Sequence, residues 1–227
     1  MIRRTRHLQQ LNSLLSRHKV VGVIGARQVG KTTLAKELSR QRKGPSTYFD
    51  LEKEEDLARL QDPYLALQDL KRLVVIDEVQ RRPGLFEALR VLVDRKRPAT
   101  RFLILGSASP ALLQQASETL AGRVIYHELN GFSLDEVGIE NHERLWLRGG
   151  FPSSYLARSH STSHEWRQGF LRAFLERDLQ QLGVSIRAAC VAQSQEPCCP
   201  GRASQGGSIL GRIRPERART AAGGVAR

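Results

Sequence analysis

The sequence predicts a three-layer α/β fold over residues 1–130, in which helices cover both faces of a parallel sheet. Short apolar runs alternate there with segments of helical periodicity, the order expected of chains that form parallel sheets. Three of the runs are continuous β-branched or leucine-rich segments, which is typical of strands buried on both faces. These runs are Val20–Ile24, Leu73–Ile76 and Arg101–Leu105. A chain of 227 residues is long enough to bury one sizeable core.

Shorter patterns predict the remaining elements of this domain. Two further strands are expected at Thr47–Phe49 and Val124–Tyr126. Helical periodicity predicts four helices, one of them broken at Pro63, over Lys31–Gln41, Glu54–Leu70, Gly84–Asp94 and Ala111–Leu120. Prolines at positions 83 and 110 stand at the starts of the last two helices, where a proline in the first turn is tolerated.

Residues 131–186 are expected to form a small helical lid or linker region. The run Ser133-Leu-Asp-Glu136 has the pattern of a capping box, in which a serine and a glutamate cover free backbone N–H groups at a helix start. Further on, apolar side chains recur at helical spacing, and we expect this stripe to pack against the α/β domain rather than bind a partner. The stripe comprises Trp166, Phe170, Phe174, Leu175, Leu179 and Leu182.

Residues 187–227 are expected to be a disordered tail. The segment has no aromatic residue, six glycines and seven arginines. Such a composition buries too little apolar surface to offset the entropy lost on ordering. Its three cysteines, Cys190, Cys198 and Cys199, have no histidine partner and no zinc-site spacing, so we interpret them as reduced thiols without a function.

The composition is that of a soluble, cytoplasmic protein with a strong positive charge. No apolar run approaches the roughly 18 residues that span a bilayer, and no signal-like apolar core follows the basic N-terminus, so no membrane partner is expected. The formal net charge is +13, from 36 Lys and Arg against 23 Asp and Glu. This charge suits an anionic partner such as nucleic acid or nucleotide phosphate. An arginine-rich coding bias explains it equally well.

The strongest motif lies between the first strand and the first predicted helix. It matches G-x-x-x-x-G-K-[ST] at every fixed position and has the strand before and the helix after that the motif requires. Backbone N–H groups of such a loop face a phosphate, the lysine reaches the β- and γ-phosphates, and the hydroxyl residue binds Mg²⁺. The predicted nucleotide-binding residues are Gly25, Ala26, Arg27, Gln28, Val29, Gly30, Lys31, Thr32 and Thr33.

A second motif, Leu73-Val-Val-Ile-Asp77-Glu78, is an apolar strand that ends in two carboxylates. Asp77 at the strand tip fits a ligand of Mg²⁺ that acts with Thr32, usually through water. Glu78 points elsewhere and is positioned to polarise an attacking water. A kinase needs its acceptor in the place of that water, so the Asp-Glu pair favours hydrolysis over phosphoryl transfer to another substrate.

Two further side chains are candidates for contact with the γ-phosphate. Ser107 ends the strand that begins at Arg101, and a polar residue there can hydrogen-bond the γ-phosphate or the water; Ser109 is the second choice, and a plain turn is an equal alternative. Arg123 precedes the last strand and is a candidate arginine finger, in cis or from a neighbouring subunit. Arg27, inside the loop, is its competitor.

Seven short motifs together resemble a known family. They are "GARQVGKTT", "YFDLE", "VVIDEVQRRPGLFEALRVLVD", "RFLILGSASP", "LAGRV", "ERLWLRGGFP" and "FLERDL". In this order they resemble the prokaryotic AAA-type (AAA+ superfamily) ATP-binding proteins, which pair an N-terminal P-loop ATPase domain with a C-terminal domain of unknown function. The resemblance covers residues 1–186 and implies a P-loop NTPase sheet of order 5-1-4-3-2.

The resemblance also implies roles for particular residues. By it, Gly25–Thr33 bind nucleotide, Asp77 and Glu78 form the Walker B pair, and Ser107 is a sensor-type residue. The motifs "GRV" and "ERD" draw attention to Arg123 and Arg177 without fixing their roles. After "QLGV" the tail departs from the family pattern and reads like a frameshifted or degraded end, with a natural disordered tail as the alternative.

The resulting hypothesis is a Mg²⁺-dependent ATPase that acts as a conformational switch, with ATP and Mg²⁺ as cofactors. A module that binds ATP with negligible turnover, because its effector domain is missing, is the alternative. A P-loop kinase is less favoured. A protein or nucleic-acid client and a homo-oligomer both stay open.

Overall fold

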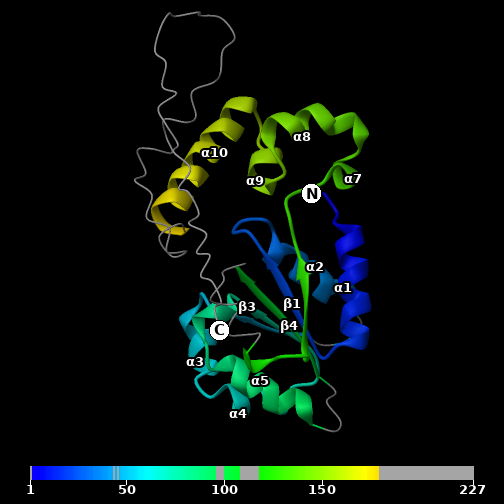
Figure 1. Ribbon diagram of the computed structural model, residues 1–227, viewed down its shortest axis with the longest axis vertical. Coiled ribbons are helices and arrows are strands. Elements are labelled where there is room, and N and C mark those ends of the chain that lie inside the picture. Colours follow the sequence, from blue (N-terminus) through cyan, green and yellow to red (C-terminus); the bar gives the residue numbers. More distant parts are fainter. Residues whose placement is uncertain (1, 43, 45, 96–99, 108–117, 179–227) are drawn as a thin grey trace, which may run out of the picture. The chain divides into compact units, whose positions relative to one another are not determined.

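The computed structural model describes residues 2–42, 44, 46–95, 100–107 and 118–178. A sheet with flanking helices forms one part of this region, and helices α7, α8, α9 and α10 gather at its other end, at the top of Figure 1. None of the helices in the described ranges has the length and apolarity that a bilayer crossing requires.

The sheet contains five strands, and all of its pairs are parallel. The strands are β1 (Val20–Gly25), β2 (Ser46–Asp50), β3 (Arg72–Asp77), β4 (Thr100–Ser107) and β5 (Val124–Glu128). Their order across the sheet is β2-β3-β4-β1-β5, which confirms the order predicted from the resemblance. All five predicted strands are present, each one to three residues longer than its pattern indicated.

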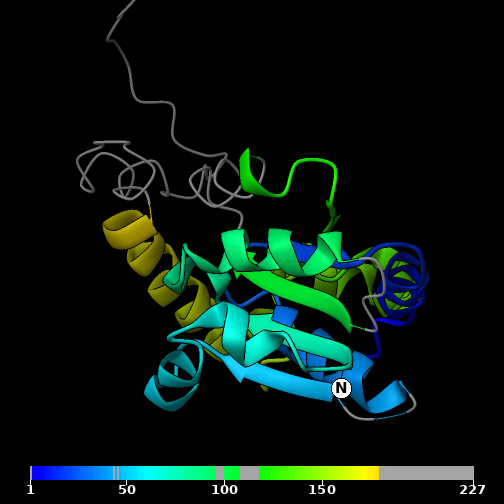
Figure 2. The same cartoon turned by 90° about the horizontal axis from the view of Figure 1, so that it is seen from below.

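Both faces of the sheet are buried, as the continuous apolar runs predicted. Along β3, Val74 and Ile76 belong to one apolar core, whereas Leu73 and Val75 belong to the other. The first core lies against α4 (Pro63–Leu67) and α5 (Leu85–Asp94), and the second against α1 (Thr5–Arg17) and α2 (Lys31–Gln41). Alternate residues of a strand point to opposite faces, so an unbroken apolar strand supplies both cores at once. Figure 2 shows α5 lying over one face of the sheet.

The helices of the α/β part match most predictions. Helix α2 has the predicted bounds, and α5 begins one residue later than expected. The predicted break at Pro63 is confirmed, because α3 (Glu54–Arg59) ends before it and α4 begins on it. The side chain of Asp62 caps α4 by accepting from the Leu65 N–H, 3.0 Å away. The helix expected at 111–120 lies mostly outside the described residues.

Helix α1 was not predicted. Its buried residues Leu8, Leu11 and Leu15 are spaced three and four apart, so the helical signal was present in the sequence.

The helical region contains α7 (Leu134–Val137), α8 (His142–Arg148), α9 (Pro152–Tyr155) and α10 (His160–Ala173), with a 3₁₀ turn at Ile139–Asn141 and a π-helical turn, η3, at Phe174–Asp178. The capping box at Ser133 is confirmed. The region has a small core of its own, formed by Phe132, Val137 and Tyr155 with the partly buried Ile2 and Leu145. The N-terminal segment therefore packs against the helical region before it enters α1.

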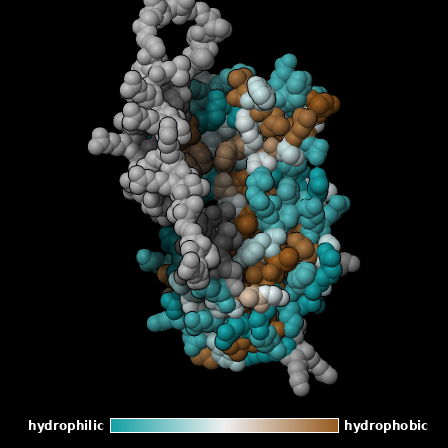
Figure 3. All heavy atoms as spheres, in the orientation of Figure 1, coloured by the Kyte–Doolittle hydropathy of each residue, from teal (hydrophilic) through white to brown (hydrophobic). Residues whose placement is uncertain are grey.

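The described part of the aromatic stripe stacks along its own helix. Trp166 stacks on Phe170 and Phe170 on Phe174, and Phe170 also packs against Phe151 at a centroid distance of 4.8 Å; Leu179 and Leu182 lie outside the described residues. Other apolar side chains of the helical region are exposed: Ile139, Trp146 and Leu147, Trp146 by 92%. Apolar surface is visible in Figure 3 at the upper end, where α8 lies.

Candidate functional site

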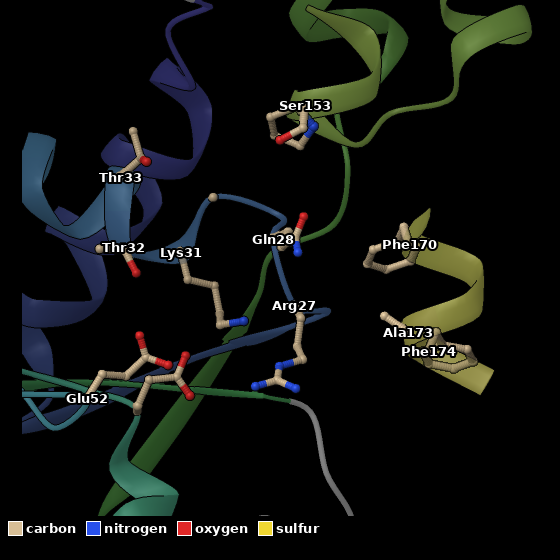
Figure 4. Close-up of a pocket in the computed structure, with 13 residues that line it drawn as sticks. Arg27, Gln28, Lys31, Thr32, Thr33, Glu52, Ser153, Phe170, Ala173 and Phe174 are labelled. Atoms are coloured by element: carbon tan, nitrogen blue, oxygen red, sulfur yellow. The ribbon is translucent and has the colours of Figure 1, made fainter. Parts of the chain in front are cut away.

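A cavity of about 690 Å³ opens where β1 and β3 end. Its polar wall consists of Arg27, Lys31, Thr32, Glu52 and Glu78. Its aromatic wall consists of Phe170 and Phe174, which face the loop after β1 from α10 and η3. Figure 4 shows the Lys31, Arg27 and Glu52 side chains directed toward the same space. The volume is in the range of small-molecule sites.

The loop between β1 and α2 depends on two glycines for different reasons. A Cβ at Gly25 would lie 2.2 Å from the Leu129 carbonyl oxygen, so this glycine is needed for close packing of backbone on backbone. Gly30 has φ of +100°, which only glycine adopts readily. Gln28 is also left-handed, with φ of 61°. The loop thus turns back on itself before α2 begins, with its N–H groups at the positive end of that helix.

Lys31 is buried at the first position of α2 and crosses the loop. Its Nζ donates to the carbonyl oxygens of Gly25 and Ala26, both at 2.9 Å. Burial lowers the pKa of Lys31, although the nearby carboxylates of Glu78 and Asp77 raise it. The ammonium group is therefore held at the centre of the polar wall, between the loop and the two acids.

Asp77 accepts three hydrogen bonds at the end of β3. Its Oδ2 accepts from the Thr32 hydroxyl at 2.7 Å and from the Tyr48 hydroxyl at 2.6 Å, and its Oδ1 accepts from the Glu78 N–H at 3.0 Å. Burial and the hydrogen bond to Asp77 raise the pKa of Tyr48, which keeps its hydroxyl a donor. Asp77 is 3% exposed, and its three hydrogen bonds fix the orientation of its carboxylate beside Thr32.

Glu78 adopts an unusual backbone conformation. Its φ is 56°, in the left-handed region, at the start of the 3₁₀ turn Val79–Arg81. A non-glycine residue is held there only when its surroundings fix it, and such residues cluster at functional sites. The Glu78 carboxylate lines the cavity and accepts a hydrogen bond from Gln80. Glu78 thus lines the cavity, whereas Asp77 beside it is hydrogen-bonded to Thr32 and Tyr48.

Ser107 lies at the carboxyl ends of the parallel strands, and Arg123 lies at their amino ends. Ser107 ends β4 beside Gly25, at the start of the loop. Arg123 immediately precedes β5, whose first residue pairs with the first residue of β1. The length of the strand separates Arg123 from the loop by roughly 16 Å. The prediction that Arg123 reaches a γ-phosphate of its own chain is therefore wrong.

Arg123 has a different partner. It forms a two-pronged ion pair with Asp94 at the end of α5, at 2.8 and 2.9 Å. Hydrogen bonds from Arg123 lower the pKa of Asp94. Arg27 lines the cavity. Ser109 and the side chain of Arg177 lie outside the described residues.

Three residues near the site were missed. Tyr48 and Glu52 flank the end of β2, and Gln80 follows Glu78. Tyr48 and Glu52 belong to "YFDLE", and because parallel strands end at the same edge of a sheet, the predicted order already placed the end of β2 beside the end of β3. Nothing in the sequence singled out Gln80.

The donor set fits Mg²⁺ bound together with phosphate. Thr32 and Asp77 offer a hydroxyl and a carboxylate oxygen, the hard ligands that Mg²⁺ prefers. No group of three or more His, Cys, Asp or Glu side chains arranged for a metal occurs within the described ranges. A Mg²⁺ at this site would depend on phosphate oxygens and water for its other ligands.

Comparison with known proteins agrees with this geometry. Residues 17–138 match the family described as AAA domain, and residues 139–199 match a domain of unknown function (DUF8612). The second match extends past residue 186, where the resemblance was expected to end. Uncharacterized proteins of Mycobacterium tuberculosis and Mycobacterium bovis are each 50% identical over 194 residues, which is 86% of this chain and 44% of theirs. The chain thus spans less than half the length of these relatives.

A solved structure shows the fold. The Walker-type ATPase of Pyrococcus abyssi superposes with a TM-score of 0.57 at 17% identity, covering 80% of this chain and 75% of that protein. The fold is that of a P-loop NTPase, which implies nucleotide binding. With the family match over the sheet and its loop, the chain belongs to the AAA domain family.

Proposed function

We propose that this cavity binds ATP with Mg²⁺ and hydrolyses it, and that the chain acts as a conformational switch. The observation that carries the proposal is the meeting of Lys31, Thr32, Asp77 and Glu78 at one end of the sheet. Lys31 and Glu78 line the cavity, and Thr32 is hydrogen-bonded to Asp77. Nucleotide hydrolysis needs a cation that binds phosphate, oxygen ligands that bind a metal and a carboxylate that polarises water, and these four residues offer all three.

Each residue has a defined task in this proposal. The N–H groups of the loop and the Lys31 ammonium bind the β- and γ-phosphates. Thr32 and Asp77 would hold Mg²⁺, which neutralises phosphate charge when bound. Glu78 orients a water molecule and polarises it for attack, and Gln80 holds the Glu78 carboxylate in place. Ser107, at the tip of β4 between β1 and β3, donates to the γ-phosphate or to the water.

The aromatic wall supplies the other half of the proposed site. Phe170 and Phe174 present ring surface toward the cavity, and a nucleotide base can stack on such surface. Because this wall comes from the helical region, a bound nucleotide would contact both parts of the protein. This double contact is the basis for the proposed switching.

The test separates hydrolysis from binding. We expect Glu78→Gln to lower the rate of phosphate release from ATP about 100-fold or more while ATP affinity changes less than about threefold, because the amide keeps the shape but cannot polarise water. Glu87→Gln on α5 is the matched control. Equal turnover in the variant and the parent would remove Glu78 from the mechanism. Tight binding with no turnover in the parent would instead favour the ATP-binding module.

A further inference from the structure

Arg4, in the segment before α1, is a buried cation with no part in the proposed chemistry. Its side chain is 8% exposed. Its Nε and Nη2 donate to the two carboxylate oxygens of Glu136 in α7, at 2.7 and 2.9 Å. Nη2 also donates to the Gly131 carbonyl at 3.2 Å. The planar fork of an arginine makes such a two-pronged pair rigid, and a lysine cannot reproduce it.

The same guanidinium group contacts the phosphate-binding loop. Nη1 lies 3.4 Å from the carbonyl oxygen of Val29, in a buried setting. The peptide bond is planar and trans, so the Val29 C=O and the Gly30 N–H point to opposite sides of the chain. With the carbonyl turned toward Arg4, the Gly30 N–H is turned away from it. Gly30 itself lines the cavity, so this N–H belongs to the group that would face a phosphate.

The loop needs such an external constraint. Val29 is flanked by two left-handed residues, Gln28 and Gly30. A non-glycine residue keeps this conformation only where neighbouring groups fix it. The Val29 side chain is anchored in the core below the loop, at 1% exposure, and Arg4 holds its carbonyl from the other direction.

Glu136, the partner of Arg4 in α7, is charged and held by several hydrogen bonds. Burial by itself would raise the pKa of Glu136, but hydrogen bonds from Arg4 and from the Ser133 N–H outweigh it and lower the pKa. Arg4 also lies over the Phe132 ring, 5.4 Å from its centroid. A single side chain thus joins the loop to the start of the helical region.

We propose that Arg4 is a positioning residue that holds the Val29–Gly30 peptide in its phosphate-binding orientation and couples that orientation to α7 through Glu136. Movement of α7 would withdraw the guanidinium group from Val29 and release the peptide. Nucleotide bound at the loop would, by the same linkage, favour one position of α7. This inference rests on the proposed function, because phosphate is the ligand that the peptide would serve.

The first readout needs no nucleotide. In the full chain, we expect Arg4→Lys to raise the amide hydrogen exchange of residues 28–31 about tenfold, with β3 and α5 unchanged, because the constraint on the loop is local. The control is Arg6→Ala. Arg6, in the first turn of α1, also pairs with α7, through Asp135 at 3.5 Å, but both side chains are more than 70% exposed. Arg6→Ala should leave the amide hydrogen exchange of residues 28–31 unchanged.

The second readout is ATP affinity. We expect Arg4→Lys to weaken it about tenfold, the effect of one charge-assisted hydrogen bond, with kcat changed less than about twofold. Glu136→Gln should reproduce the loop effect, and the double variant should add little to either change because both act through one contact.

Two outcomes would overturn the inference. The first is amide hydrogen exchange of residues 28–31 that equals that of the parent in both Arg4→Lys and Glu136→Gln. The second is faster exchange throughout the fold in these variants, which would show that the ion pair is purely structural. Failure of the proposed function is distinguishable. If the parent binds no ATP while Arg4→Lys still loosens the loop, the positioning role stands and the nucleotide proposal fails.

Discussion

The two walls of the cavity differ in how firmly their side chains are held. On the polar wall, Lys31 donates two hydrogen bonds to the loop, and Thr32 is tied to Asp77, which accepts three. On the aromatic wall, Phe170 and Phe174 are only partly buried and are held by ring stacking. Hydrogen bonds fix direction, whereas ring contacts tolerate displacement. The polar wall is therefore held in direction by its own hydrogen bonds, and the aromatic wall can adapt to a ligand.

The largest expected effect comes from breaking the polar wall. We expect Lys31→Ala to weaken ATP binding about 100-fold, because it removes the ammonium group that faces the phosphates from a buried position. Isothermal titration of ATP with Mg²⁺ measures the change. Lys53→Ala, an exposed lysine, is the control. An affinity within twofold of the parent would show that the phosphates bind elsewhere.

A smaller effect is expected from the aromatic wall. We expect Phe170→Ala to weaken ATP binding about tenfold, because stacking of a base on an aromatic ring contributes roughly 1–3 kcal/mol. Binding of inorganic tripolyphosphate, which has no base, should stay unchanged, and Phe170→Tyr should retain ATP affinity. Equal losses for both ligands would place the base away from this wall.

The smallest effect concerns the contact between α1 and β5, outside both walls. His7 and His127 share a hydrogen bond of 2.8 Å beside Arg4 and Glu136. Burial and the positive neighbours His7 and Arg4 lower the pKa of His127 to about 4, and burial with Arg4 also lowers that of His7. Between pH 6.5 and 4 the unfolded chain therefore binds more protons than the folded chain, so stability falls as the pH falls through this window.

The loss of stability at acidic pH can be measured. Because both rings are only partly buried, we expect a loss of about 1 kcal/mol in the free energy of unfolding between pH 7 and pH 5. Urea unfolding at the two pH values measures the loss, and His127→Gln should reduce it. The exposed His164 serves as the control position. A loss that His127→Gln leaves unchanged would assign the acid sensitivity to other groups.

The parts of the site that are contiguous in sequence were predictable. The loop motif and the carboxylates at the end of β3 indicated their own positions, because local backbone geometry and strand direction place them. Tyr48 was missed although β2 was predicted, since a tyrosine hydroxyl gains its role only from the acid that comes within reach. The role of Arg123 within its own chain was wrongly predicted because its tertiary neighbours are not visible in the sequence. Its partner, Asp94, is 29 positions away in the sequence, and the sheet separates both from the loop.

The sequence by itself determined the layered fold, the strand order that its resemblance implied and the position of the glycine-rich loop between β1 and α2. Each of these depends on residue spacing and on side chains close together along the chain. Tertiary structure alone decided that Phe170 and Phe174 face the loop across the cavity. It also brought Arg4 against Glu136, across 132 positions, with Val29 on its other side. The physical reason is that a buried ion pair or a stacked ring is selected by distances of a few ångströms between separate elements, which no local pattern encodes.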